Sequence, residues 1–92
     1  MRFRFGPRKS KRLSANPRRG IGFEEAQQVF SRPYYLDQRF DLHEQCRAVG
    51  WVGERIYPVV FEMMAGKGGD YYHLVTLWRA TREEQQLYEE NS

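Results

Sequence analysis

Residues 44–64 read EQCRAVGWVGERIYPVVFEMM, two apolar runs joined by a tight turn. Over 44–51 the residues alternate between two different faces, as the side chains of a strand do. Over 55–64 the run is apolar on both faces, which predicts a strand that is buried on both sides. The turn at 52–54 contains Gly53 and makes the two runs an antiparallel hairpin. Pro58 has no amide hydrogen, so it predicts a bulge or an unpaired backbone position in the second strand.

Three further segments extend this hairpin into a larger sheet. A glycine-rich loop over 65–70 leads into a return strand over 71–78. Residues 34–40 form a strand or an extended loop. At the N-terminus, arginines alternate with phenylalanines over 2–5, a pattern typical of a short half-buried strand. The predicted sheet is an antiparallel meander of three to five strands.

Helices are predicted before and after the meander. Residues 8–15 form one or two helical turns, which end before Pro17. Residues 23–30 have apolar side chains at helical spacing and two acids in the first turn. A capping box that starts at Thr81 predicts a C-terminal helix over 82–90. The fold class is therefore α+β, with N-terminal helices and one C-terminal helix packed on the sheet.

Length and composition limit the class of protein. The 92 residues are 40% hydrophobic and make a single domain over 1–92, in which a basic segment at 1–20 precedes the helix, sheet and C-terminal helix of 21–92. No apolar run approaches the roughly 20 residues that span a bilayer, and no signal-peptide pattern is found, so we expect neither membrane insertion nor secretion. The single cysteine, Cys46, forms no internal disulfide and is predicted to be a core thiol. We expect a cytoplasmic protein with no cofactor and no metal site.

Charge is segregated along the chain. The first 20 residues carry eight arginines and lysines and no acid, although the net charge of the whole chain is only +3. A protein that binds polyanions uses such a segment to attract phosphates and to release their counterions. Nucleic acid is therefore the first partner to consider, and the alternative is a solvated or disordered basic tail. The cations expected to bind RNA are Arg8, Lys9, Lys11, Arg12, Arg18 and Arg19.

Three motifs, GIGFEEAQQVF at 20–30, RAVGWVG at 47–53 and WRATREE at 78–84, resemble the BrnT-type toxins. They follow the family's order and spacing, and the resemblance covers about residues 3–90. Members of that family are ribonuclease toxins of type II toxin and antitoxin pairs, with a fold related to RelE and the small microbial ribonucleases. The resemblance implies that the chain cleaves mRNA and is neutralised by a cognate ribbon-helix-helix antitoxin. It also implies that operator DNA is contacted through the antitoxin, in a complex that can contain a dimer.

The resemblance further implies a mechanism. RNA cleavage of this type needs no metal ion and uses the substrate's own 2′-hydroxyl as nucleophile, so the protein must move protons and stabilise a phosphorane. Arg79 and Arg82 match the arginines of the family's last motif, beside the start of the final helix, where phosphate binds favourably. The chain departs from the family at Gln45 and Met64, where many relatives have arginine. Lys67, in the loop that follows, is the replacement for the second of these.

Histidine is the side chain best suited to proton transfer near neutral pH, and the chain has only His43 and His73. His43 ranks ahead because it precedes an acid near the place where the family clusters charge, whereas the direction of His73 depends on strand register. Glu62 is a further candidate base if it lies near arginines. The toxin hypothesis predicts one concave face on which Arg79, Arg82 and Lys67 converge with His43 or Glu62.

Two other functions fit the same sequence. A protein-interaction subunit would use the basic segment to dock an acidic antitoxin. A non-catalytic RNA- or DNA-binding module would stack bases on exposed aromatic rings, although core packing is the ordinary role of such rings. Arg79 and Arg82 would be structural if they paired with Glu83, Glu84 or a carboxylate of the sheet. The rings considered for stacking are Tyr34, Tyr35, Tyr71, Tyr72 and Trp51.

Overall fold

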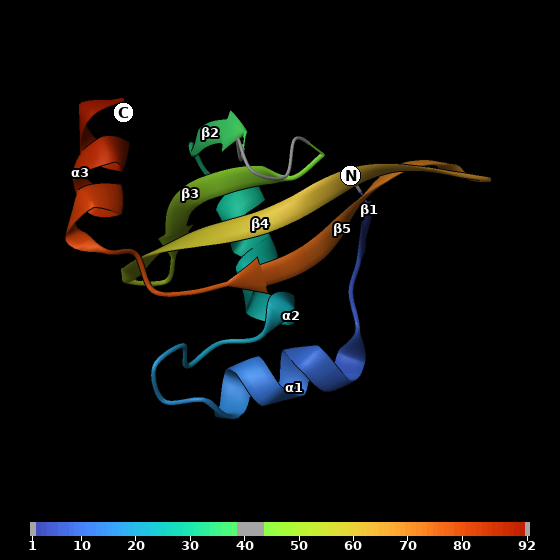
Figure 1. Ribbon diagram of the computed structural model, residues 1–92, viewed down its shortest axis with the longest axis horizontal. Helices are drawn as coiled ribbons and strands as arrows, with labels where there is room; N and C mark the ends of the chain where they lie inside the picture. Colours follow the sequence, from blue (N-terminus) through green and yellow to red (C-terminus); the bar gives the residue numbers. More distant parts are fainter. Residues whose placement is uncertain (1, 39–43, 92) are drawn as a thin grey trace.

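The computed structural model describes residues 2–38 and 44–91. Within these ranges, helices lie on both faces of one five-stranded sheet (Figure 1). The strands are β1 (Arg2–Arg4), β2 (Tyr35–Gln38), β3 (Cys46–Val52), β4 (Arg55–Gly66) and β5 (Gly69–Leu77). The helices are α1 (Pro7–Ala15), α2 (Phe23–Ala26) with its 3-10 continuation η1 (Gln27–Ser31), and α3 (Arg82–Glu90). The predicted α+β class is confirmed.

The strands lie in the order β1-β5-β4-β3-β2. Each neighbouring pair from β2 to β5 is antiparallel, so the predicted meander is confirmed for these four strands. In contrast, β1 pairs in parallel with β5. A parallel pair needs a long connection, and most of the chain lies between these two strands. The sheet is therefore mixed, with β1 and β2 as its edges.

The hairpin of β4 and β5 is longer and tighter than the sequence predicts. Its turn is only Lys67 and Gly68, because Gly66 and Gly69 already pair across the two strands. Gly69 has a φ of 110°, which favours glycine at this position. The predicted loop over 65–70 is thus mostly strand.

Pro58 occupies a position where its missing amide hydrogen breaks no strand pairing. It is in register with Val49 of β3, and its carbonyl accepts a 3.4 Å hydrogen bond from the amide of Trp78. Trp78 follows the end of β5, so the nitrogen of Pro58 faces a place where β5 has already ended. The bulge in β4 falls between Val60 and Phe61. The bulge is therefore not at Pro58, whose backbone pairs in register with β3 and lacks only an amide donor on the β5 side.

The hydrophobic core fills the space between the N-terminal helices and one face of the sheet. Side chains alternate along strands, so the neighbours of core residues point to the other face. Glu62 and His73 follow and precede the core residues Phe61 and Leu74, and Arg4 lies between two phenylalanines that pack on the core. We call this second face the open face. The core cluster contains Leu13, Phe23, Ala26, Val29, Ala48, Val52, Tyr57, Val59, Phe61, Leu74 and Leu77, and Cys46 packs against it.

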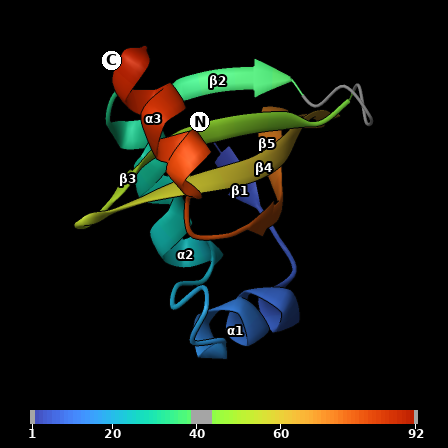
Figure 2. The same ribbon diagram turned by 60° about the vertical axis from the view of Figure 1, so that its left-hand side comes forward.

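The C-terminal helix α3 covers the β3 side of the open face (Figure 2). It begins with the predicted capping box, in which the amide of Glu84 donates to the hydroxyl of Thr81 at 3.2 Å and the amide of Thr81 donates to the Glu84 carboxylate at 2.9 Å. Farther along, the ring of Tyr88 meets that of Trp51, with centroids 6.4 Å apart. These contacts leave the β1, β5 and β4 side of the open face uncovered by α3.

The basic helix α1 is fixed to the fold by Leu13 and Ser10, which are both buried. The hydroxyl of Ser10 accepts a 2.8 Å hydrogen bond from the amide of Phe23, at the start of α2, and donates to Glu24. The bond from Ser10 lowers the pKa of the Glu24 carboxyl. In the described parts of the chain, no helix is long and apolar enough to cross a membrane.

Candidate functional site

Three adjacent strands place a cation, an imidazole and a carboxylate in one row across the open face. Arg4 of β1 is the register partner of His73 in β5, and His73 is the register partner of Glu62 in β4. Nδ1 of His73 lies 3.4 Å from Oε1 of Glu62. The two side chains are 45% and 27% exposed, so a ligand in solution can reach both. The row Arg4, His73 and Glu62 is the first candidate site.

β1 positions the cation of this row. Arg4 stacks over the ring of Tyr71, with its guanidinium carbon 4.4 Å from the ring centroid. Arg2 lies two residues before Arg4 and on the same face, and it donates a 2.7 Å hydrogen bond to the carbonyl of Gly69. On the opposite side of the strand, the ring of Phe3 packs 5.2 Å from that of Phe30 in the core. The strand β1 therefore packs on the core through Phe3 and places Arg2 and Arg4 on the open face.

The row has the parts required for proton transfer beside an anion. An imidazole whose Nδ1 faces a carboxylate is held in one orientation and presents Nε2 as the reactive nitrogen. The guanidinium of Arg4 is a permanent cation that binds phosphate with two parallel hydrogen bonds. Such a group stabilises the negative charge that develops on a phosphorane.

Arg47 shares this face but has a structural role. Its Nε donates a 3.0 Å hydrogen bond to Asp37 of β2, Nη2 donates to the second oxygen of the same carboxylate, and Nη1 donates to Glu84 at 3.1 Å. The hydrogen bond to Asp37 is the main cause of the raised pKa of Arg47. This network joins β2, β3 and α3, and each of the three side-chain nitrogens of Arg47 donates one hydrogen bond within the fold.

The predicted catalytic cations lie far from one another. Lys67 is in the turn before β5 and Arg79 follows its end, so the nine residues of β5 separate them by roughly 30 Å at about 3.3 Å per residue. Arg82 is the first residue of α3. Among the described residues, Arg79 and Arg82 form no ion pair; Glu84, one of the carboxylates considered for them, pairs with Arg47. The predicted convergence of Lys67 with these arginines is not found.

The other candidates differ in position. Glu62 lies on the open face with His73 as its partner, a pair that the sequence alone did not indicate. His43 falls outside the described residues. The sequence signal that identifies the partner of Glu62 is the two-residue turn of the hairpin, because turn length fixes register.

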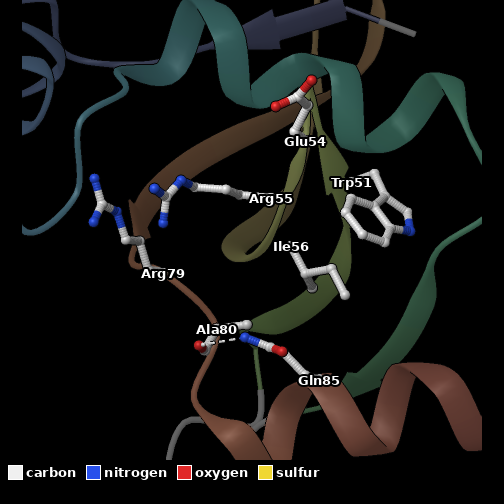
Figure 3. Close-up of a pocket in the computed structure, with 7 residues that line it drawn as sticks. All are labelled: Trp51, Glu54, Arg55, Ile56, Arg79, Ala80 and Gln85. Atoms are coloured by element: carbon white, nitrogen blue, oxygen red, sulfur yellow. Dashed lines mark hydrogen bonds between the residues drawn. The ribbon is translucent and has the colours of Figure 1, made fainter.

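Arg79 contributes to a second site, a pocket of about 230 Å³ between the β3–β4 turn and α3. Figure 3 shows the guanidinium groups of Arg55 and Arg79 on one side of it and the indole of Trp51 on the other. Gln85 donates from Nε2 to the carbonyl of Ala80 at 3.4 Å. The remaining lining residues are Glu54 and Ile56.

The cations predicted to bind RNA lie in the helical layer, on the side of the sheet away from the open face. Arg8, Lys11 and Arg12 of α1 are exposed, as is Arg18, and Lys9 is half-buried. Arg19 is tied to the sheet, since its Nε donates a 2.7 Å hydrogen bond to the carbonyl of Leu77 and its own carbonyl accepts one from Tyr57 at 3.0 Å. The basic segment is therefore divided, with Arg2 and Arg4 on the open face and the rest across the sheet.

Four of the five aromatic rings considered for base stacking have partners in the fold, and the fifth, Tyr35, lies in the edge strand β2. Tyr72 packs 4.5 Å from Phe61 and 5.3 Å from Phe30, and its burial raises the pKa of its hydroxyl. Tyr34 meets Phe30, and Tyr71 lies under Arg4. Trp51, which meets Tyr88, also lines the pocket.

Comparison with models of protein families and with curated proteins finds no match for this chain. In the described ranges, no group of three or more histidine, cysteine, aspartate or glutamate side chains is arranged to hold a metal ion.

Proposed function

We propose that this chain is an endoribonuclease that cleaves RNA through attack of the substrate's 2′-hydroxyl. The observation that carries the proposal is the row Arg4, His73 and Glu62 on the open face. The row combines a permanent cation with an oriented imidazole, and both are accessible to a single-stranded substrate.

Each member of the row has a distinct role in the proposed reaction. Glu62 holds Nδ1 of His73, and Nε2 takes the proton from the 2′-hydroxyl as that oxygen attacks the phosphorus. Arg4 stabilises the charge of the phosphorane. The bond to the 5′-oxygen then breaks, and this oxygen takes a proton from the hydroxyl of Tyr71, on the same face. Transfer of the proton held by His73 through solvent to the tyrosinate then restores both groups. The products are a 2′,3′-cyclic phosphate and a free 5′-hydroxyl.

In this proposal the chain is a cytoplasmic toxin of the BrnT type, with a RelE-like fold. A ribbon-helix-helix antitoxin neutralises it and contacts operator DNA. Support comes from the three sequence motifs and from the exposed cations of α1, which suit an acidic partner. The first test of this interaction is whether an acidic antitoxin encoded beside this chain co-purifies with it. The second is whether the affinity of the two proteins falls when Arg8 and Arg12 are replaced by glutamine.

A second candidate function is RNA binding without cleavage. The observation that favours it is the separation of Lys67 from Arg79, since cations so far apart do not surround one phosphate. Strong, salt-dependent binding of RNA that stays intact is the expected behaviour of such a module.

The deciding experiment incubates the purified protein with mixed mRNA in the presence of a chelator and maps the product ends. The wild type should release 2′,3′-cyclic phosphates, and His73→Gln should reduce cleavage about 100-fold or more, the usual range for a lost proton-transfer group. The Arg79→Ala plus Arg82→Ala variant is the comparison. If this double variant abolishes cleavage while His73→Gln does not, the reactive centre lies near Arg79 and Arg82, after the end of β5. If intact RNA is bound by the wild type, the second function holds.

A further inference from the structure

The pocket between the β3–β4 turn and α3 contains two arginines with no ion-pair partner among the described residues. Arg55 begins β4 and Arg79 follows β5, so two different strands place them together (Figure 3). Among the described residues that line the pocket, Glu54 is the one acid, and its carboxylate lies apart from both guanidinium groups in Figure 3. Like charges held close together are unfavourable unless an anion joins them. This end of the sheet is therefore suited to an anionic group.

Further arginines surround the same end of the sheet. A methyl group on Gly20 would meet Nη2 of Arg79 at 3.1 Å, so this guanidinium packs against the segment that follows Arg19. Nε of Arg19 is fixed on the carbonyl of Leu77, and Nη1 of Arg32 donates to the carbonyl of Gly53 at 3.4 Å. These fixed cations add positive potential without occupying the pocket.

The rest of the pocket is suited to a base. Trp51 and Ile56 form an apolar wall, and the amide of Gln85 offers hydrogen-bonding groups beside it. At about 230 Å³ the pocket is smaller than the roughly 300–1,000 Å³ of sites for drug-sized ligands, so it takes one nucleotide unit. Base stacking on an aromatic ring combined with phosphate binding by cations is the usual mode of single-strand recognition.

We propose that this pocket binds one nucleotide unit of single-stranded RNA, with the phosphate between Arg55 and Arg79 and the base against Trp51. The inference rests on the proposed function in that RNA is the substrate. The pocket is separate from the reacting row: the four steps of β5 from His73 to Leu77 span roughly 13 Å at about 3.3 Å each, and Arg79 lies two residues past the end of that strand. The bound unit is thus several nucleotides away from the cleaved bond and fixes the position of the strand.

The test uses a short, fluorescently labelled RNA oligonucleotide that is fully 2′-O-methylated, because it binds but cannot be cleaved through the 2′-oxygen. Arg55→Gln plus Arg79→Gln should weaken its binding about tenfold or more and lower the slope of log affinity against log salt by about 0.7, the value of one phosphate contact on a single strand. Arg8→Gln plus Arg12→Gln removes the same charge from α1 and is the comparison. In the wild type, indole fluorescence should be quenched on binding, and Trp51→Phe should remove this quenching.

The outcomes separate the pocket from the cleavage mechanism. If His73→Gln still cleaves RNA while the pocket variant binds weakly, the proposed row fails and the pocket stands. If the wild type cleaves RNA and the pocket variant binds the methylated oligonucleotide as the wild type does, the pocket proposal fails and the row stands. Equal weakening by the pocket and α1 variants, or no binding by the wild type, also overturns the pocket proposal.

Discussion

At the scale of single residues, the carboxylate of Glu84 joins the end of β5, the sheet and α3. It accepts hydrogen bonds from Nε1 of Trp78 at 2.9 Å, from the amide of Thr81 at 2.9 Å and from Arg47 at 3.1 Å, and the residue is only 7% exposed. Glutamine can still accept the capping hydrogen bond from Thr81 through its one oxygen. Its NH2 group, however, would face the N–H donors of Trp78 or Arg47, which need an acceptor. We expect Glu84→Gln to lower the free energy of unfolding by about 1.5–3 kcal/mol, as measured by urea titration. The exposed Glu83→Gln is the control, and an equal effect of both changes would contradict this account.

The carboxyl of Glu24 gives the stability of the protein a predictable pH dependence. The hydrogen bond from Ser10 lowers its folded pKa from the ordinary value of 4.5. A lowered folded pKa stabilises the protein above pH 4.5, and this contribution is lost as the pH falls through the folded pKa. We expect the wild type to be more stable than Glu24→Gln near pH 7, and the two curves of unfolding free energy against pH to converge below pH 4.5. Curves that stay parallel down to pH 2 would refute the role of this bond.

At the scale of elements, the packing of α1 against α2 depends on the absence of a side chain at Gly22. A methyl group there would lie 2.6 Å from the hydroxyl of Ser10 and 2.8 Å from its carbonyl oxygen. The carbonyl belongs to the backbone of α1, so the two helices must separate to make room. We expect Gly22→Ala to cost about 1–3 kcal/mol of unfolding free energy, the usual range for an overpacked contact.

The control for this change is Gly6→Ala, at the N-cap of α1. There the new methyl group meets only Cβ of Lys9 at 3.9 Å, an ordinary contact. Thermal unfolding of the two variants, compared with the wild type, tests the steric account. A Gly22→Ala protein as stable as Gly6→Ala would show that α1 shifts freely.

Elements with local signals could be predicted from the sequence, whereas pairings between distant segments could not. The helix that starts at Arg82 was predicted over the residues observed, because the capping box of Thr81 acts within one turn. The parallel pairing of β1 depends on residues at the other end of the chain and has no local signal. The pair of His73 and Glu62 was missed for a similar reason, since the loop predicted over 65–70 left the register of the hairpin undefined.

At the scale of the whole molecule, the positive charges of the N-terminal segment lie on two different surfaces. Arg4 is on the open face, whereas Arg8 and Arg12 are exposed on the helical layer across the sheet. A charge count along the sequence treats them as one patch, because it contains no information on how the chain turns after β1. The structure therefore separates two groups of cations that the composition combines: Arg4, in one row with His73 and Glu62, and the exposed cations of α1 on the opposite side of the sheet.

Phe3, on the core side of β1, holds this strand in place and so helps to position Arg4 on the open face. Its ring lies 5.2 Å from Phe30 and 5.9 Å from Tyr72, and these contacts hold the edge strand that carries Arg4. We expect Phe3→Ala to cost about 1–3 kcal/mol, because a partly buried aromatic ring is lost. It should also speed hydrogen exchange of the amides in β1 more than those of β3.

If Arg4 stabilises the phosphorane, Phe3→Ala should lower RNA cleavage as much as Arg4→Gln does, although residue 3 points away from the substrate. Arg4→Gln is the matched control, since it should leave hydrogen exchange in β1 unchanged. A Phe3→Ala protein in which β1 exchanges freely while cleavage stays at the wild-type rate would remove Arg4 from the reacting row. The proposal would then depend on His73 and Glu62 alone, whose strands pair without β1.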